Sequence, residues 1–231
     1  MVKKIVGTGV LLVLALALQA GVKMYTLKSP DGKVKLEVTA GQGIAYSLFY
    51  DGRLLLKPSR IALHTDLPEA DHWENIRITG TKQRHVSETV QAPFYRVKEF
   101  GIDCNELELR LNNGFSLLMR AYNDGMAYRF VAGRKGEMTV VEERAEFNFA
   151  DDFEAYIPYS TNPKDPWNMA FQNFYTKAPL TQYNTELPAF LPLTVDVGAV
   201  KLTLLESDLE AYPGMFVCGA VSYTHLTLPT T

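Results

Sequence analysis

The sequence predicts an all-β protein built from antiparallel strands, and three observations support this prediction. Apolar and polar residues alternate with a period of two along several short segments, most clearly at Val34–Val38 and Leu107–Leu111. Turn residues that tolerate positive φ, such as Asp51-Gly52 and Asn113-Gly114, separate these segments. Beyond residue 20, no segment of ordinary helix length carries a convincing amphipathic pattern. Many short strands at this spacing are typical of a sandwich or a barrel.

Further strands are predicted where aromatic and β-branched residues gather between turn signals. They are Ile44–Tyr50, Ile61–His64, Ile76–Thr79, Tyr95–Phe100, Met126–Val131, Thr139–Glu142, Ala145–Phe149, Leu193–Val197, Val200–Leu205 and Met215–Cys218.

Composition excludes several other classes of protein. The 231 residues carry a net charge of −3, which offers no basic surface for phosphates, so we expect no nucleic-acid partner. Two cysteines are too few for a disulfide scaffold or a four-cysteine zinc site, and the sequence leaves open whether Cys104 and Cys218 pair. A hydrophobic share of 47% is enough for a buried core, and we expect one domain over residues 24–220.

The first 20 residues have the layout of a secretory signal peptide. Lys3 and Lys4 precede the uncharged apolar run Ile5–Leu18, and Ala20 provides a small residue at the expected cleavage point. The alternative is an uncleaved membrane anchor, for which the apolar run is short. We therefore expect an exported protein, located in the periplasm and without membrane attachment after cleavage.

The residues numbered 221–231 differ in character from those before them. Gly214–Ala220 has the composition of a buried strand, whereas Val221–Leu226 resembles the translation of a transposase sequencing adapter. We predict that residues 221–231 are not native and that the reading frame is cut near Ala220. A natural linker rich in threonine and proline is the alternative.

The segment 158–192 does not follow the strand pattern. It carries six prolines, Trp167 and several tyrosines, with little alternation. A connection of this length in a compact domain is usually functional or disordered, and its aromatic content disfavours disorder. Aromatic rings beside amides and carboxylates suit sugars, because the C–H faces of sugars stack on rings while their hydroxyls need planar polar partners.

Other chemistry is sparsely represented in the sequence. There is no nucleophile elbow, and the histidines lack the spacing of metal ligands, so His72 is expected in an exposed loop and His64 in a structural role. Glu206 and Asp208 follow the apolar run Leu202–Leu205. Carboxylates at the end of a buried strand either bond to a neighbouring loop or are directed at a ligand.

Several strings occur in an order that resembles the N-terminal domain of glycoside hydrolase family 97, a family of α-glucosidases and α-galactosidases common in gut Bacteroidetes. The similarity covers Met24–Ala220. The strings are Ser29-Pro30-Asp31-Gly32-Lys33, Lys57–Leu63, Asn123–Phe130, Leu205–Leu209 and Tyr212–Met215.

The resemblance implies a β-supersandwich of the galactose-mutarotase-like type, which a catalytic (β/α)8 barrel follows in complete members. Two positioned carboxyl groups perform the hydrolysis in such enzymes, and the resemblance places them in the barrel, so we expect no catalytic residue here. The implied function is a carbohydrate-binding or active-site-supporting domain of an exported α-glycosidase. Its expected partners are an α-linked oligosaccharide and the catalytic barrel.

The resemblance also directs attention to particular residues. We expect contact with substrate, or with a domain interface, at Trp167, Phe171, Asn173, Tyr175, Glu206 and Asp208. Family members hold a calcium ion, and the position of a ligating Glu is occupied here by Gln172, whose amide brings no negative charge.

Two other functions remain open at this point. One is a stand-alone periplasmic carbohydrate-binding module. The other is a mutarotase-like sugar epimerase, which needs a His and a Glu that converge in one cleft, with His64 and His85 as the strand-borne candidates.

Overall fold

The computed structural model describes residues 23–162, 164–167, 171–207, 209, 212–219 and, for the backbone only, 225–227. The predicted signal peptide, residues 1–20, and the site candidate Asp208 lie outside the described residues. Most of the predicted foreign tail, residues 221–231, lies outside them too. Within the described part, no helix has the length and apolarity that a membrane crossing requires.

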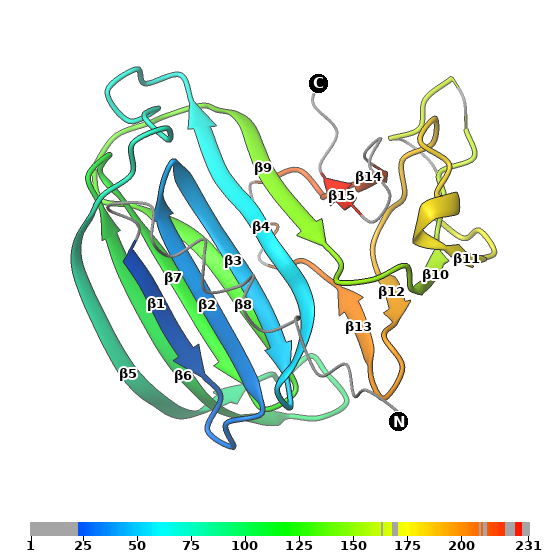
Figure 1. Ribbon diagram of the computed structural model, residues 1–231, viewed down its shortest axis with the longest axis horizontal. Coiled ribbons are helices and arrows are strands. Elements are labelled where there is room, and N and C mark those ends of the chain that lie inside the picture. Colours follow the sequence, from blue (N-terminus) through cyan, green and yellow to red (C-terminus); the bar gives the residue numbers. More distant parts are fainter. Residues whose placement is uncertain are drawn as a thin grey trace, which may run out of the picture.

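The chain folds into three antiparallel sheets (Figure 1). The largest has the strand order β1-β2-β3-β4-β9-β15-β14, and a second sheet, β5-β6-β7-β8, packs against its β1–β4 side. A third sheet, β11-β10-β12-β13, lies beside them and precedes the C-terminal strands. The predicted all-β sandwich is confirmed.

The strands of the largest sheet are β1 (Lys23–Lys28), β2 (Val34–Gly41), β3 (Gly43–Tyr50), β4 (Arg53–Thr65), β9 (Val140–Asn148), β15 (His225–Thr227) and β14 (Cys218–Gly219). The second sheet contains β5 (Ile78–Gln91), β6 (Glu99–Leu111), β7 (Phe115–Tyr122) and β8 (Gly125–Ala132). The third contains β10 (Glu154–Ile157), β11 (Thr176–Pro179), β12 (Leu193–Asp196) and β13 (Lys201–Leu204), and a short 3-10 turn, η2 (Leu180–Gln182), follows β11.

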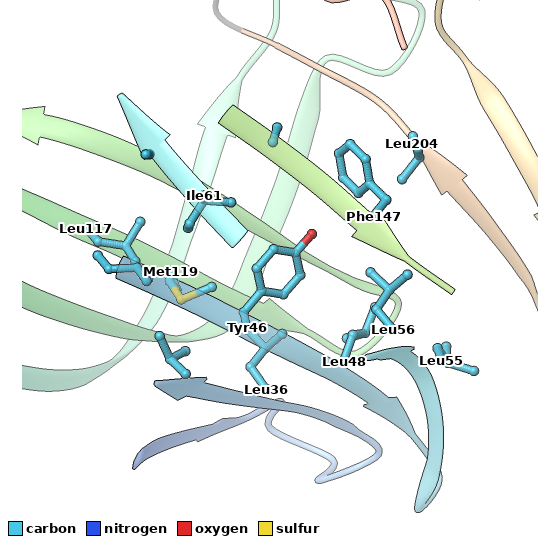
Figure 2. Close-up of a cluster of buried hydrophobic side chains, with 14 of the residues drawn as sticks. Leu36, Tyr46, Leu48, Leu55, Leu56, Ile61, Leu117, Met119, Phe147 and Leu204 are labelled. Atoms are coloured by element: carbon cyan, nitrogen blue, oxygen red, sulfur yellow. The ribbon is translucent and has the colours of Figure 1, made fainter. Parts of the chain in front are cut away.

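The space between the first two sheets is filled by the apolar side chains that alternate along their strands. In β2 the residues at positions 34, 36 and 38 are buried, and in β7 the residues at positions 115, 117, 119 and 121 are buried. Figure 2 shows Leu36, Tyr46, Leu117 and Met119 packed together, each 1% exposed or less. Burial of one such side chain stabilises the fold by about 1.5–3 kcal/mol, so this layer is the main source of stability.

The tightest predicted turn is confirmed. Asp51 and Gly52 both have positive φ, 48° and 77°, and they join β3 to β4 where Tyr50 pairs with Arg53. This conformation matches the twist of the strands on either side, which is why Asp-Gly is favoured there. The Asn113-Gly114 turn differs from the prediction, because β6 and β7 are joined by residues 112–114 and only Gly114 has positive φ.

Four strands are longer than the sequence predicts. One of them, β6, begins at Glu99, so the predicted strand Tyr95–Phe100 overlaps it only at its last two residues. β4 extends back to Arg53, and β9 is a single strand where the sequence predicts two. β5 runs over 14 residues, of which only Val86 is buried. A strand that is exposed on both faces shows no alternation, so its length is hidden in the sequence.

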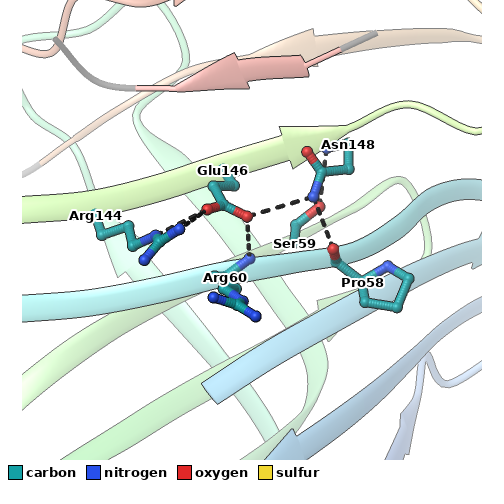
Figure 3. A network of polar contacts seen from close by, with 6 residues as sticks. All are labelled: Pro58, Ser59, Arg60, Arg144, Glu146 and Asn148. Carbon is teal, nitrogen blue, oxygen red and sulfur yellow. Dashed lines mark hydrogen bonds and ion pairs between the residues drawn. The ribbon is translucent and has the colours of Figure 1, made fainter. Parts of the chain in front are cut away.

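A buried glutamate joins β4 to β9 (Figure 3). The carboxylate of Glu146 accepts hydrogen bonds from Arg144 Nε at 2.8 Å and from the backbone N–H of Arg60 at 3.1 Å. Asn148 donates to the carbonyl of Pro58 at 2.7 Å. Burial alone would raise the pKa of Glu146, but these N–H donors lower it below the usual value of 4.5, so the carboxylate is held charged.

Candidate functional site

The aromatic segment 158–192 lies against the C-terminal part of the chain through a small β-bridge system. Ala189 pairs with Tyr159 on one side and with Val217 on the other. The N–H of Ala189 and the N–H of Val217 each donate to the other residue's carbonyl, both at 2.8 Å. Ala189 and Val217 are fully buried. In extended chain the neighbouring side chains point the opposite way, so residues 190 and 216 face away from that core.

Four rings from three parts of the chain gather there, and we call Trp167, Phe171, Phe190 and Phe216 the aromatic platform. Phe216 contacts Trp167 with ring centroids 4.8 Å apart and Phe171 at 5.8 Å. Phe171 also contacts Phe190 at 5.2 Å. Edge-on and tilted contacts of this kind are favourable between aromatic rings. Trp167 is still 46% exposed and Phe171 40%, so both retain ring surface for another partner.

Phe171 has an unusual backbone conformation. Its φ is +51°, in the left-handed region that bulky residues rarely occupy. Such a conformation costs about 1–3 kcal/mol and persists only where neighbouring contacts fix it. Here the ring contacts and the bonds of Asn173 supply that constraint.

Two of the predicted contact residues use their polar groups within the fold. Asn173 Nδ2 donates to the carbonyl of Tyr159 at 2.7 Å and to Thr161 Oγ1 at 3.2 Å. The Tyr175 hydroxyl donates to the carbonyl of Pro192 at 3.1 Å. These bonds hold the segment beside the platform. Gln172 is exposed, and no hydrogen bond joins its side chain to the described residues.

Glu206 bonds to a neighbouring loop, which is one of the two alternatives predicted for it. Its two carboxylate oxygens both accept the backbone N–H of Met215, at 2.8 and 2.7 Å. Burial raises the pKa of Glu206 above its usual value of 4.5, although the Met215 N–H opposes this shift.

A second carboxylate holds the same loop. Tyr212 donates its hydroxyl proton to Glu143 Oε2 at 2.7 Å, which ties the loop to β9. Burial raises the pKa of Glu143, and the negative charge of Glu206 raises it further. The two carboxylates therefore lie close enough to repel each other when both are ionised.

The described residues do not fit a calcium site. No group of three or more His, Cys, Asp or Glu side chains gathers anywhere among them. Calcium takes six to eight oxygen ligands, and Gln172 offers one uncharged oxygen on the exposed surface.

An open groove of about 480 Å³ between β1 and the β5–β6 pair is lined by both His85 and Glu106. Their side chains point to opposite faces of the sheet, because Glu106 pairs with Arg84 and His85 pairs with Asn105. Both carboxylate oxygens of Glu106 are engaged, by Arg84 Nε at 2.6 Å and Arg120 Nε at 2.8 Å. Burial favours a raised pKa for Glu106, but the two guanidinium groups overcome it and the pKa is lowered. The Glu106 carboxylate is therefore held charged and is a weak base.

The histidines have structural contacts as well. The ring nitrogens of His85 contact Asn105 Oδ1 at 3.0 Å and Asp103 Oδ1 at 3.1 Å. His64 Nδ1 bonds to Asp71 at 2.7 Å, and His72 is exposed in a loop, as predicted. These contacts disfavour the mutarotase-like alternative, which needs a His and a Glu available to a sugar.

Sequence reasoning missed Phe190 and Phe216 as platform members. Residue 216 was expected only as part of a strand, and its contacts with Trp167 and Phe171 arise from pairing between distant segments. The thiols of Cys104 and Cys218 are both free, which resolves the pairing that the sequence left open.

Comparison with known proteins places the whole described domain in one family. A family profile described as "Glycosyl-hydrolase 97 N-terminal" matches residues 27–230. A retaining alpha-galactosidase of Bacteroides thetaiotaomicron is 39% identical over 219 residues, which cover 92% of this chain and 33% of that protein. A probable retaining alpha-galactosidase of Streptomyces bingchenggensis is 26% identical over 158 residues, 67% of this chain and 24% of that protein. The chain thus spans a third or less of the length of these curated relatives.

Solved structures show the same fold. A glycoside hydrolase family 97 enzyme from Pseudoalteromonas, in complex with acarbose, superposes with a TM-score of 0.74 at 18% identity, covering 89% of this chain and 31% of that one. A beta-arabinopyranosidase superposes with a TM-score of 0.76 at 21% identity, covering 91% and 35%.

Proposed function

Because this chain belongs to the glycosyl-hydrolase 97 N-terminal family, we propose that it is the leading β-domain of an exported α-glycosidase. In this role it supports a catalytic region and does not itself cleave sugars. The proposed substrate of the whole enzyme is an α-linked oligosaccharide. Both curated relatives are named as alpha-galactosidases or probable ones, which favours an α-galactoside over an α-glucoside.

The observation that carries this proposal is the aromatic platform beside the exposed amide of Gln172. Trp167 is 46% exposed and Phe171 40%, and Gln172 follows Phe171 directly. An uncharged surface of rings and one amide suits the C–H faces and hydroxyls of a neutral sugar or a neighbouring protein surface. We propose that it faces the substrate side of the catalytic region.

The carboxylates near the platform and in the groove support the non-catalytic assignment. Hydrolysis of a glycosidic bond needs one carboxyl group to donate a proton and another to act as base or nucleophile. The carboxylates of Glu106 and Glu206 instead accept N–H groups with both oxygens, and Glu143 accepts the Tyr212 hydroxyl.

The test is an assay of the purified chain with an aryl α-galactoside and an aryl α-glucoside. We expect no turnover above buffer, and we expect addition of calcium to change nothing. Turnover at an ordinary enzymatic rate, retained after a second independent purification, would overturn the proposal.

A stand-alone carbohydrate-binding module is the second candidate, and the exposure of the platform favours it. Titration calorimetry with α-linked oligosaccharides separates the two. A supporting domain is expected to give no measurable heat on its own. A binding module is expected to bind, and to lose binding in Trp167→Ala but not in Phe174→Ala, since Phe174 is fully exposed and outside the platform.

For calcium, we propose that Gln172 contributes at most one neutral oxygen, with charged ligands coming from outside the described residues. Calorimetric titration with calcium alone is expected to show no binding to the wild-type chain. Gln172→Glu restores a carboxylate at this position, and by itself it is still expected to bind with a Kd weaker than about 1 mM, since one charged ligand is far short of a calcium shell. Micromolar binding by the wild type would contradict this.

A further inference from the structure

Within the described part of the chain, the side chain of Glu206 connects the loop after β13 to the aromatic platform. Glu206 follows β13 by two positions, and its carboxylate closes the loop by accepting the N–H of Met215, nine residues later. Met215 directly precedes Phe216, which is the ring that contacts both Trp167 and Phe171. The position of Phe216 therefore depends on where Met215 is held.

The two sides of Phe216 are anchored differently. On its C-terminal side, Val217 exchanges two backbone hydrogen bonds with Ala189, and its carbonyl accepts the hydroxyl of Tyr183 at 2.7 Å. On its N-terminal side, among the described residues, the backbone is held by the Glu206 carboxylate at Met215. Among the described residues, loss of this anchor leaves the backbone beside Phe216 held directly only on its C-terminal side.

Solvent alone would be a poor substitute for this anchor. Glu206 is partly buried, and a part-buried N–H that loses its acceptor is destabilising unless it moves to water. Movement of Met215 toward water would carry Phe216 away from the rings of Trp167 and Phe171. The second tie of the loop, from Tyr212 to Glu143, lies three residues before Met215 and constrains Phe216 less directly.

We propose that Glu206 is the positioning residue of the aromatic platform: it holds Phe216 as the common backing for the exposed rings of Trp167 and Phe171. The inference rests on the proposed function only in assuming what the platform contacts. The part played by Glu206 in holding Phe216 does not depend on that contact. Glu206 touches no ligand in this assignment and acts through Met215 and Phe216.

Trp167 provides a direct readout. The chain has two tryptophans, and Trp73 is only 5% exposed, so quenching of fluorescence by acrylamide reports mainly on Trp167. Subtraction of the signal of Trp167→Phe removes the remainder from Trp73. The measurement needs no sugar and no catalytic region.

We expect Glu206→Ala to raise the acrylamide quenching constant of Trp167 about twofold, because the ring loses its contact with Phe216. Glu206→Gln keeps an acceptor oxygen at the same place, so it is expected to retain the wild-type quenching. Glu186→Ala serves as the matched control, because Glu186 is an exposed acid outside the loop. Circular dichroism should report the same strand content for all variants.

The outcomes separate this inference from the proposed function. Wild-type quenching in Glu206→Ala, with the fold retained, would overturn the positioning role. A change of similar size in Glu206→Gln would overturn it too, since an amide oxygen should suffice. If Glu206→Ala does not fold, Phe216→Leu must reproduce the increase in Trp167 quenching, and failure to do so overturns the inference. A quenching change together with an active isolated chain would leave the positioning role standing and reject the proposed function.

Discussion

Gly219 lies so close to the ring of Tyr183 that no side chain fits between them. A Cβ built on Gly219 would be 2.5 Å from Cδ1 and 2.9 Å from Cγ of that ring. The ring is itself buried and fixed, because the Tyr183 hydroxyl donates to the carbonyl of Val217 and the ring packs edge-on against Tyr159 at 5.0 Å. Because Gly219 has no side chain, β14 can approach the ring of Tyr183 this closely.

Gly219→Ala is expected to lower the free energy of unfolding by about 1–3 kcal/mol, the usual cost of overpacking a fixed core. Urea unfolding followed by circular dichroism measures this change. Gly101→Ala is the matched control, since a Cβ at Gly101 meets nothing within 4 Å, and it should be neutral or slightly stabilising. Equal stability of the two variants would show that β14 can move away from Tyr183.

At the scale of elements, one glutamate binds three strands of the second sheet together. Arg84 of β5 pairs in register with Glu106 of β6, and Glu106 pairs with Arg120 of β7. The carboxylate of Glu106 is 6% exposed and bonds to both guanidinium groups. β5 has few buried side chains of its own, so this charge cluster carries an unusual share of its attachment.

Glu106→Ala is expected to destabilise the protein by about 2–3 kcal/mol, somewhat less than a fully buried pair, because Arg84 can regain water. Glu108→Ala on the same strand should cost less than about 0.5 kcal/mol, since its partner Arg110 is 62% exposed. Hydrogen exchange should show the loss first in the amides of β5. A uniform loss over both sheets would contradict the local role of this cluster.

The loop between β13 and β14 makes the stability of the folded protein depend on pH. The pKa values of Glu143 and Glu206 are both raised in the folded protein, so ionisation costs more there than in the unfolded chain. Their stabilising contribution is therefore fully present below the unfolded value, about 4.5, and is lost as the pH rises through the raised values. Glu143→Gln removes one of the two charges without removing the acceptor oxygen for Tyr212.

We accordingly expect Glu143→Gln to be more stable than the wild type at pH 7.5, because the amide avoids the cost of ionising a buried carboxyl group beside Glu206. At pH 4 the two proteins should have nearly the same stability. Thermal unfolding at the two pH values measures this difference. A variant that is less stable than the wild type at pH 7.5 would mean that the Tyr212 bond needs the charged carboxylate.

The sequence predicted several, but not all, of the strands whose burial differs between their two faces. The alternating segments in β2 and at the end of β6 were predicted, whereas β7 alternates as clearly and was missed. Asp51-Gly52 has the one conformation that its hairpin needs. β5 was mostly hidden because both its faces are exposed. The platform could be predicted only in part. Trp167 and Phe171 lie in a segment with a distinctive composition, whereas the part played by Phe216 follows from long-range pairing that no local pattern records.

At the scale of the whole molecule, the last two described strands, β14 and β15, extend the largest sheet beyond β9. The backbone of β15 pairs with β9 on one side and β14 on the other. The same residues, 225–227, lie in the segment predicted to be foreign to the gene. We expect the uncut genomic locus to encode a different sequence after codon 220, continuing into a catalytic region. A locus that encodes residues 221–231 followed by a stop codon would contradict this expectation.

We expect residues 1–20 to determine in which compartment the sandwich folds. The first described strand, β1, begins at Lys23, just after the proposed cleavage point at Ala20, so cleavage leaves the whole sandwich intact. Expressed with residues 1–20 in a Gram-negative host, the protein should appear in the periplasmic extract with Gly21 as its first residue by mass spectrometry. A chain that lacks residues 1–20 should remain in the cytoplasm, since the signal is absent. Recovery of the uncut chain from the membrane fraction would favour the anchor instead, and would mean that the sandwich folds beside the bilayer, with its N-terminal edge strand β1 tethered there.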